Sequence, residues 1–359
     1  MFLRKDTKVL KIGSVKIGGG NPIAVQSMTN TDTRNWKATV KQIKELEKYG
    51  CEIIRVSVPD IESAKNISKI KKHISIPLVA DIHFDYKLAI ESIKQGVDKL
   101  RINPGNIGSK QKVQELVKVA KDYKIPIRIG VNAGSLKAVQ SCSTVAKRAK
   151  ALTAAALEHV DILEECNFNN IAVSLKASDI ATTVEAYNLF SQQRNYPLHL
   201  GITESGSIFR GTIKSSAGLA VMLYNGLGDT IRVSLTANPV EEVKVAYQIL
   251  QSLNLRTTGV EVVSCPTCSR TKVNLIKIVN ELEEELAKIK NDNVKKQIKI
   301  AVMGCVVNGP GEAKEADFGI AGGIGEGLLF KKGEIKCKIK ESQWVKKLLE
   351  LYKKELKNG

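Results

Sequence analysis

The sequence predicts an α/β chain in two parts, a TIM (β/α)8 barrel followed by a smaller α+β domain. Eight short β-branched segments recur through the first part, and most of them precede a segment with helical periodicity. Strands alternating with helices are typical of βα units around a parallel sheet, and eight units over about 250 residues fit a closed barrel. The runner-up, a doubly wound open sheet, lacks the glycine-rich dinucleotide turn after its first strand.

The expected strands are short apolar segments, and most of them carry polar residues at alternate positions. The expected strands are Ile23–Met28, Ile53–Val58, Pro77–Asp81, Lys99–Asn103, Pro126–Asn132, Ile171–Lys176, Pro197–Thr203 and Thr230–Ser234. The helices expected between them are Trp36–Tyr49, Ile61–Lys72, Tyr86–Gln95, Lys110–Tyr123 and Val184–Gln193. A last barrel helix, Val240–Leu253, follows Asn238-Pro239, a favourable start because proline suits the first helical turn.

The linker is expected at residues 254–259, which divides the chain into a substrate-binding barrel at 1–255 and a second domain at 259–359. The second domain is expected to hold a helix over Thr271–Lys290, a strand over Ile298–Val302, a strand around Ile339 and a final helix over Trp344–Lys357. Its glycine-rich stretch, Gly319–Gly327, is interpreted as a set of turns and not as a phosphate cradle.

Composition excludes several classes of protein. Hydrophobic residues make up 43% of the chain, enough for a sizeable core, and no apolar run reaches the length of a membrane span. The seven cysteines are unevenly spaced and there is no apolar leader, so we expect a protein of the reducing cytoplasm. The net charge of +18 raises the alternative of nucleic-acid binding, but only 5% of residues are aromatic, which favours a solvated lysine-rich surface.

Polar residues of one parity follow the strands and predict an anion site. They are Arg55, Ser57, Arg101, Asn103, Arg128, Gly130, Asn132, Ser174, Lys176, Arg232 and Ser234, with Asp81 and His83 after the third strand. The outer face of a barrel strand packs on helices and must be apolar, so these residues point inward. Several guanidinium groups in one cavity repel each other, and phosphate oxygens would relieve that repulsion. The pattern therefore predicts a substrate with several phosphate charges.

Three cysteines in the second domain indicate a metal centre. Cys265 and Cys268 form a Cys-x-x-Cys pair, and Cys305 follows the expected strand. The turn after Cys305 could direct Glu312 at the same metal, and a carboxylate binds iron less tightly than a thiolate does. This set favours a reactive iron–sulfur cluster.

The competing interpretation is a structural zinc site with a fourth ligand from elsewhere, in a barrel transferase or phosphate-binding protein. The four histidines all lie in the barrel part, and Cys337 is the candidate for a fourth thiolate. Cys51, Cys142, Cys166 and also Cys337 are interpreted most simply as buried hydrophobic residues.

Seven motifs together resemble the GcpE/IspG family of bacterial 4-hydroxy-3-methylbut-2-enyl diphosphate synthases. Two lie in the second domain, Ser264–Arg270 and Met303–Glu312. The others are Gln26–Asn30, Ala80–Phe84, Arg101–Gly108, Arg128–Ser135 and Gly201–Gly206. The resemblance extends over essentially the whole chain, with no departure at a ligand or pocket position.

The resemblance implies a TIM barrel joined to a 4Fe–4S domain, in a homodimer where one subunit's cluster domain closes the other's barrel. It implies cluster ligation by Cys265, Cys268, Cys305 and Glu312. The substrate-pocket residues that it implies are Arg55, His83, Arg101, Arg128, Asn132, Lys176, Glu204 and Ser234.

The implied activity is the reductive ring opening and dehydration of 2-C-methyl-D-erythritol 2,4-cyclodiphosphate in the non-mevalonate (MEP) isoprenoid pathway. Electrons would come from ferredoxin or flavodoxin, both usually acidic, which the basic surface suits. Glu204 is the candidate proton donor to the departing hydroxyl, assisted by His83, and Glu312 is the exchangeable cluster ligand. Simple positioning of substrate is the alternative role for Glu204 and for His83.

Overall fold

The computed structural model describes residues 3–103, 107–256, 259–287, 289, 297–305 and 314–358. The chain divides into two compact units, Met1–Arg256 and Thr257–Gly359. Among these described residues, none of the helices combines the length and the apolar composition of a membrane span.

The first unit is a closed barrel of eight parallel strands. They are β3 (Ala24–Met28), β4 (Ile53–Ser57), β5 (Leu78–Asp81), β6 (Lys99–Ile102), β7 (Ile127–Asn132), β8 (Ile171–Lys176), β9 (His199–Leu200) and β10 (Thr230–Ile231). Their order is β8-β7-β6-β5-β4-β3-β10-β9, and a parallel bridge from Val173 to Leu198 joins the two ends. The predicted barrel is confirmed and the open-sheet alternative is wrong, although β9 and β10 are shorter than expected.

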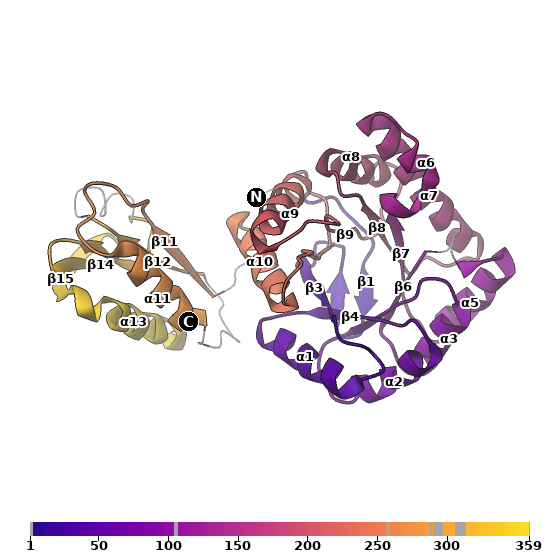
Figure 1. The fold of residues 1–359 in the computed structure, drawn as a ribbon, viewed down its shortest axis with the longest axis horizontal. Helices are drawn as coiled ribbons and strands as arrows, with labels where there is room; N and C mark the ends of the chain where they lie inside the picture. Colours follow the sequence, from indigo (N-terminus) through magenta and orange to yellow (C-terminus); the bar gives the residue numbers. More distant parts are fainter. Residues whose placement is uncertain are drawn as a thin grey trace. The chain divides into compact units, whose positions relative to one another are not determined.

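Helices surround these strands (Figure 1). They are α1 (Trp36–Lys48), α2 (Ile61–Lys71), α3 (Tyr86–Lys94), α5 (Lys110–Asp122), α6 (Lys137–Gln140), α7 (Val145–Glu165), α8 (Ile180–Ser191), α9 (Ile208–Tyr224) and α10 (Pro239–Ser252), with a 3-10 turn at Ala133–Ser135. Side chains of Asp60, Asp85, Asp179 and Asn238 accept hydrogen bonds from the first turns of α2, α3, α8 and α10. Such caps satisfy backbone N–H groups that have no partner within the helix.

Two long helices, α7 and α9, were not predicted from periodicity. Apolar side chains of α9 occur on both its faces, since Leu219 and Met222 are buried while Phe209 and Val221 are exposed. A helix that is apolar all round gives no clear stripe, so its period is hidden in the sequence.

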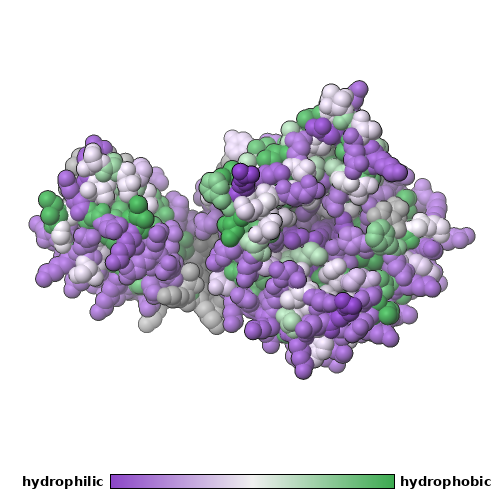
Figure 2. All heavy atoms as spheres, viewed as in Figure 1, coloured by the Kyte–Doolittle hydropathy of each residue, from purple (hydrophilic) through white to green (hydrophobic). Residues whose placement is uncertain are grey.

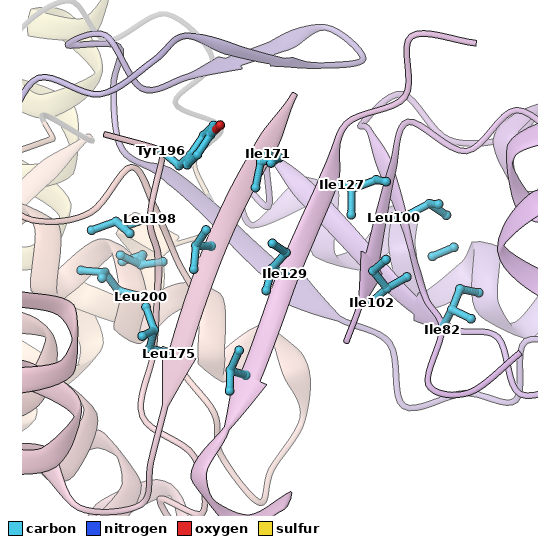
Figure 3. Packing of buried hydrophobic residues seen from close by; sticks show 14 of the residues in the cluster. Ile82, Leu100, Ile102, Ile127, Ile129, Ile171, Leu175, Tyr196, Leu198 and Leu200 are labelled. Atoms are coloured by element: carbon cyan, nitrogen blue, oxygen red, sulfur yellow. The ribbon is translucent and has the colours of Figure 1, made fainter. Parts of the chain in front are cut away.

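Outward-facing strand residues form the main core between strands and helices. Leu100, Ile102, Ile127, Ile129 and Leu175 are fully buried there, as Figure 3 shows. They alternate along the strands with the polar residues, so the expected division into an apolar outer face and a polar inner face is present.

An N-terminal hairpin that the sequence did not predict, β1 (Leu10–Ile12) with β2 (Val15–Ile17), packs against one end of the barrel. Leu10, Ile12 and Ile17 form a buried cluster with the first inward residues of the strands, including Ala24 and Ile53. Apolar side chains thus fill the amino end of the barrel, so the polar inward residues lie toward the carboxyl end, where active sites of this fold occur.

The second unit is a five-stranded mixed sheet with two helices. Its strands are β11 (Val260–Ser264), β12 (Ile298–Met303), β13 (Phe318–Gly322), β14 (Glu326–Lys331) and β15 (Glu334–Lys340), in this order. Helices α11 (Leu275–Ala287) and α13 (Trp344–Asn358) pack together on the sheet, with a 3-10 turn at Glu341–Gln343 before α13.

Two expectations for this unit need correction. The stretch Gly319–Gly327 forms most of β13 and the start of β14, joined by a tight turn, and is not a set of turns. Gly319 and Gly327 lie under Phe330 and Trp344, whose rings leave no room for a side chain, so packing explains these glycines. Helix α11 begins at Leu275, four residues later than expected, after a turn at Cys268–Thr271.

Candidate functional site

Six cationic side chains point into the barrel. They are Arg55, Lys99, Arg101, Arg128, Lys176 and Arg232, on β4, β6, β7, β8 and the segment after β10. Strands of such a barrel are staggered by about one residue per strand, so inward side chains of alternate strands share one level. The registers place Arg55, Arg101 and Arg232 at one level, with Arg128 and His199 at the level below. Lys176 lies nearest to the carboxyl end.

Asp81 connects three of the predicted pocket residues. Its carboxylate lies 3.1 Å from Arg101 Nη1, 3.4 Å from His83 Nε2 and 3.8 Å from Arg55 Nε. Burial alone would raise the pKa of Asp81, but Arg55, His83 and Arg101 together lower it well below its usual range. Asp81 is therefore a buried carboxylate that fixes the directions of the groups around it.

Arg232 has a separate partner. Its Nε and Nη2 lie 3.3 and 3.4 Å from the carboxylate of Glu242 on α10, which also accepts from Ser27 Oγ and the Leu235 N–H. Among the described residues, Asp81 and Glu242 are the carboxylates that pair with the six cations. The inward face therefore carries an excess of positive charge.

Several buried nitrogen atoms on this inward face have no hydrogen-bond partner within the described part of the chain. They are Lys99 Nζ, Arg128 Nε and Nη1, and His199 Nε2. Burial, followed by the charges of neighbouring cations, lowers the pKa values of Lys99, Arg128, Lys176 and His199 well below their ordinary values. An anion bound beside these groups at the carboxyl end of the barrel would remove part of the electrostatic penalty that they carry.

Two inward glycines make room for the cations. A Cβ at Gly130 would lie 2.3 Å from Arg101 Nε, and Arg101 Nη2 donates to the Gly130 carbonyl at 3.2 Å. A Cβ at Gly201 would lie 2.6 Å from Lys176 Nζ and 2.7 Å from the Arg232 carbonyl oxygen. These close approaches explain glycine at both positions.

Replacement of Gly130 with alanine is expected to displace Arg101 from Asp81 and to lower the free energy of unfolding by about 1–3 kcal/mol, the usual cost of overpacking. Denaturant titration measures the loss. The control is Gly134→Ala, where a Cβ would meet only Glu204 Oε1 at 3.9 Å, an ordinary contact. Equal stability of the two variants would contradict the close packing of Arg101 on Gly130.

Glu204 has a strained backbone. Its φ is +54°, a left-handed conformation that non-glycine residues rarely adopt and that clusters at functional sites. Its carbonyl accepts a hydrogen bond from Lys214 Nζ at 3.2 Å, and its carboxylate extends toward Gly134 after β7. Loops after β7 and β9 thus meet at Glu204, and the side chain is exposed.

The remaining predicted pocket residues occupy carboxyl ends of strands. Asn132 ends β7, Lys176 ends β8, and Ser234 follows β10 with its side chain partly exposed. The structure therefore gathers the predicted pocket residues at one end of the barrel. Strand alternation predicted that Asp81 and Arg232 point inward but gave them no role, and the inward positions of Lys99 and His199 were missed. Lys99 could have been predicted, because it lies two residues before Arg101 on β6 and therefore on the same face.

Cys265 and Cys305 follow neighbouring parallel strands. Ser264 at the end of β11 is paired in register with Val302 of β12, so both cysteines emerge at the same edge of the sheet. The Gly304 N–H donates to Cys265 Sγ at 3.2 Å. Hydrogen bonds to sulfur are a feature of thiolate metal centres.

The Cys268 turn is fixed to the same loops. The Cys268 N–H donates to Thr271 Oγ1 at 3.1 Å, and the Lys272 N–H donates to the Gly304 carbonyl at 3.1 Å. A hydrogen bond from the Arg270 backbone N–H lowers the pKa of Cys268, which favours the thiolate. These features suit soft-metal ligation.

The fourth predicted ligand, Glu312, lies outside the described residues. Within them, no group of three His, Cys, Asp or Glu side chains is arranged to hold a metal ion. The expectation of a buried side chain is confirmed for Cys51 but wrong for Cys337, which is exposed, while Cys142 and Cys166 are partly exposed. Cys337, the alternative thiolate, is on β15, three strands away from β12 at about 4.8 Å per strand. Ligation by Cys337 would therefore require a rearrangement of the sheet.

Two family models match almost the whole chain. The GcpE TIM-barrel domain matches residues 7–247, and the GcpE protein C-terminal domain matches residues 261–354. A relative from Thermodesulfovibrio yellowstonii is 57% identical over 99% of this chain and 100% of its own length. One from Clostridium acetobutylicum is 56% identical over 96% and 98%. Both are named 4-hydroxy-3-methylbut-2-en-1-yl diphosphate synthase (flavodoxin).

Solved structures support the fold alone. The dihydropteroate synthases of Stenotrophomonas maltophilia and Yersinia pestis have TM-scores of 0.53 and 0.52, with 13% and 12% identity. The structural matches extend over 69% and 68% of this chain and over 98% of each synthase chain. The full-length relatives and both family models show, in agreement with the motifs, that this chain belongs to the GcpE family.

Proposed function

We propose that this chain catalyses the reductive ring opening of 2-C-methyl-D-erythritol 2,4-cyclodiphosphate to 4-hydroxy-3-methylbut-2-enyl diphosphate, in the MEP pathway of isoprenoid synthesis. The observation that carries the proposal is the excess of buried, inward cations at the carboxyl end of the barrel. The relatives' names describe synthesis of this product with flavodoxin. The reaction consumes two electrons and two protons and releases one water.

The barrel would bind the diphosphate. Arg55, Arg101, Arg128 and Lys176 are the proposed ligands of the phosphate oxygens, because guanidinium groups form paired hydrogen bonds with such oxygens. Asn132 and Ser234 would complete the pocket with neutral donors. Binding would replace repulsion among the cations by attraction to the ligand, so affinity is expected to fall steeply as salt increases.

Cys265, Cys268, Cys305 and Glu312 would hold a 4Fe–4S cluster. The observed N–H donor to Cys265, the lowered pKa of Cys268 and the shared sheet edge of Cys265 and Cys305 fit such a group. When bound, the cluster would supply the electrons and a Lewis-acidic position. Glu312 is the proposed exchangeable ligand.

Glu204 is the proposed proton donor to the departing hydroxyl. Its exposed carboxylate and left-handed backbone, beside the loop after β7, support this role. His83 is held by Asp81 at 3.4 Å and would assist by orienting the substrate or by sharing the proton.

We further propose that the protein is a cytoplasmic homodimer and that it takes electrons from flavodoxin or ferredoxin.

Anaerobic purification is expected to give brown protein that contains iron and sulfide in stoichiometric amounts. With a chemical reductant, this protein should convert the cyclodiphosphate to the open-chain diphosphate. Mass spectrometry measures the formation of this product. Colourless protein with stoichiometric zinc and no conversion would instead support a structural zinc domain.

A further inference from the structure

The sulfur of Met28 lies between two of the inward arginines. Met28 ends β3, and its Sδ is 2.9 Å from Arg55 Nη2 and 3.1 Å from Arg55 Nε. Arg232 Nη1 approaches the same sulfur at 3.6 Å. Arg55 lies within β4 and Arg232 directly follows β10, and these two strands flank β3 in the barrel. One thioether therefore links two guanidinium groups from opposite sides.

A thioether is a neutral and weak hydrogen-bond acceptor. It can align N–H donors without cancelling their charge, whereas a carboxylate would neutralise them. The contact matters most for Arg55, because its ion pair with Asp81 is long, at 3.8 Å. Burial and the charges of Arg232 and Arg101 lower the pKa of Arg55 despite Asp81, which shows that its charge is incompletely compensated.

Phosphate oxygens are much better acceptors than sulfur. An entering diphosphate would therefore displace the sulfur at little cost and find both guanidinium groups already converged. Alignment before binding increases affinity because less side-chain freedom is lost on binding.

We propose that Met28 is a positioning residue, whose sulfur holds Arg55 and Arg232 converged until the oxygens of a diphosphate replace it. This inference rests on the proposed diphosphate substrate. It gives Met28 a role in binding and no part in electron or proton transfer.

The test uses inorganic pyrophosphate as the probe and titration calorimetry of the full chain at one fixed salt concentration, without magnesium. Met28→Leu keeps the volume and removes the acceptor, so it is expected to weaken binding about threefold to tenfold. Met28→Gln restores a neutral acceptor and should recover part of that loss. Met28→Glu should weaken binding about 100-fold, because its carboxylate would pair with the arginines. Met222→Leu, a buried replacement on α9, is the matched control and should bind normally.

In the assay of cluster-loaded enzyme, Met28→Leu should raise KM with kcat nearly unchanged, as expected for a loss of binding alone. Thermal unfolding of each variant separates folding from binding. If the Met28→Leu protein binds pyrophosphate as tightly as the unaltered chain, whatever its thermal stability, the proposed role of Met28 is overturned. The proposed function would still stand. Failure of the unaltered chain to bind pyrophosphate would count against the diphosphate substrate itself.

Discussion

Replacement of Cys305 with alanine is expected to abolish both turnover and the binding of the proposed iron–sulfur cluster. Cys305 follows β12 at the sheet edge where Cys265 follows β11, and within the second unit Cys337 on β15 could not take its place without moving a strand. Loss of one thiolate from a cluster with three leaves too few ligands to retain it. Iron and sulfide analysis, paramagnetic resonance after reduction and the mass-spectrometric assay measure the effect.

The matched control is Cys337→Ala. Cys337 is exposed on the edge strand β15 and is expected to be dispensable, so this variant should keep its iron, sulfide and activity. Full activity in Cys305→Ala, or loss of iron in Cys337→Ala, would contradict the assigned ligand set.

Replacement of Asp81 with asparagine is expected to lower kcat/KM by about 100-fold or more. The change removes the carboxylate that pairs with Arg101 and Arg55 and leaves buried charges uncompensated, which typically costs about 3–5 kcal/mol. Because the folded-state pKa of Asp81 is depressed, its stabilising contribution is fully present above the ordinary pKa of an unfolded aspartate, and so at neutral pH. It is lost progressively as pH falls from that ordinary value through the depressed folded-state value. Steady-state kinetics measures the loss of kcat/KM, and denaturant titration at neutral pH measures the loss of stability.

Asp85→Asn provides the control on the same loop. Asp85 caps α3 through the Lys87 N–H, and asparagine caps helices about as well as aspartate, so stability and kcat/KM should stay close to those of the unaltered chain. Retained activity in Asp81→Asn would show that the arginines do not depend on this carboxylate.

Short-range periodicity explains which parts of the fold could be predicted. The eight strands follow from period two and the six predicted barrel helices from period 3.6, both of which depend on neighbours in the sequence. Helix α9 was missed because both its faces carry apolar residues, and the strands at Gly319–Gly327 were missed because the packing of Phe330 and Trp344 demands glycine. In both places tertiary contacts outweighed local propensity.

The inward direction of Arg55, Arg101, Arg128 and Lys176 was also determined by the sequence, since strand parity leaves no other face for them. The spacing of the Cys-x-x-Cys pair likewise predicts a shared metal, and this stays a prediction. Only the tertiary structure decided that Asp81 holds Arg55, Arg101 and His83, that Met28 lies between two arginines, and that Cys265 and Cys305 leave the sheet side by side. Alternation fixes the side of a strand on which a residue lies, but the register between distant strands fixes its neighbours, and that register exists only once the barrel and the sheet have formed.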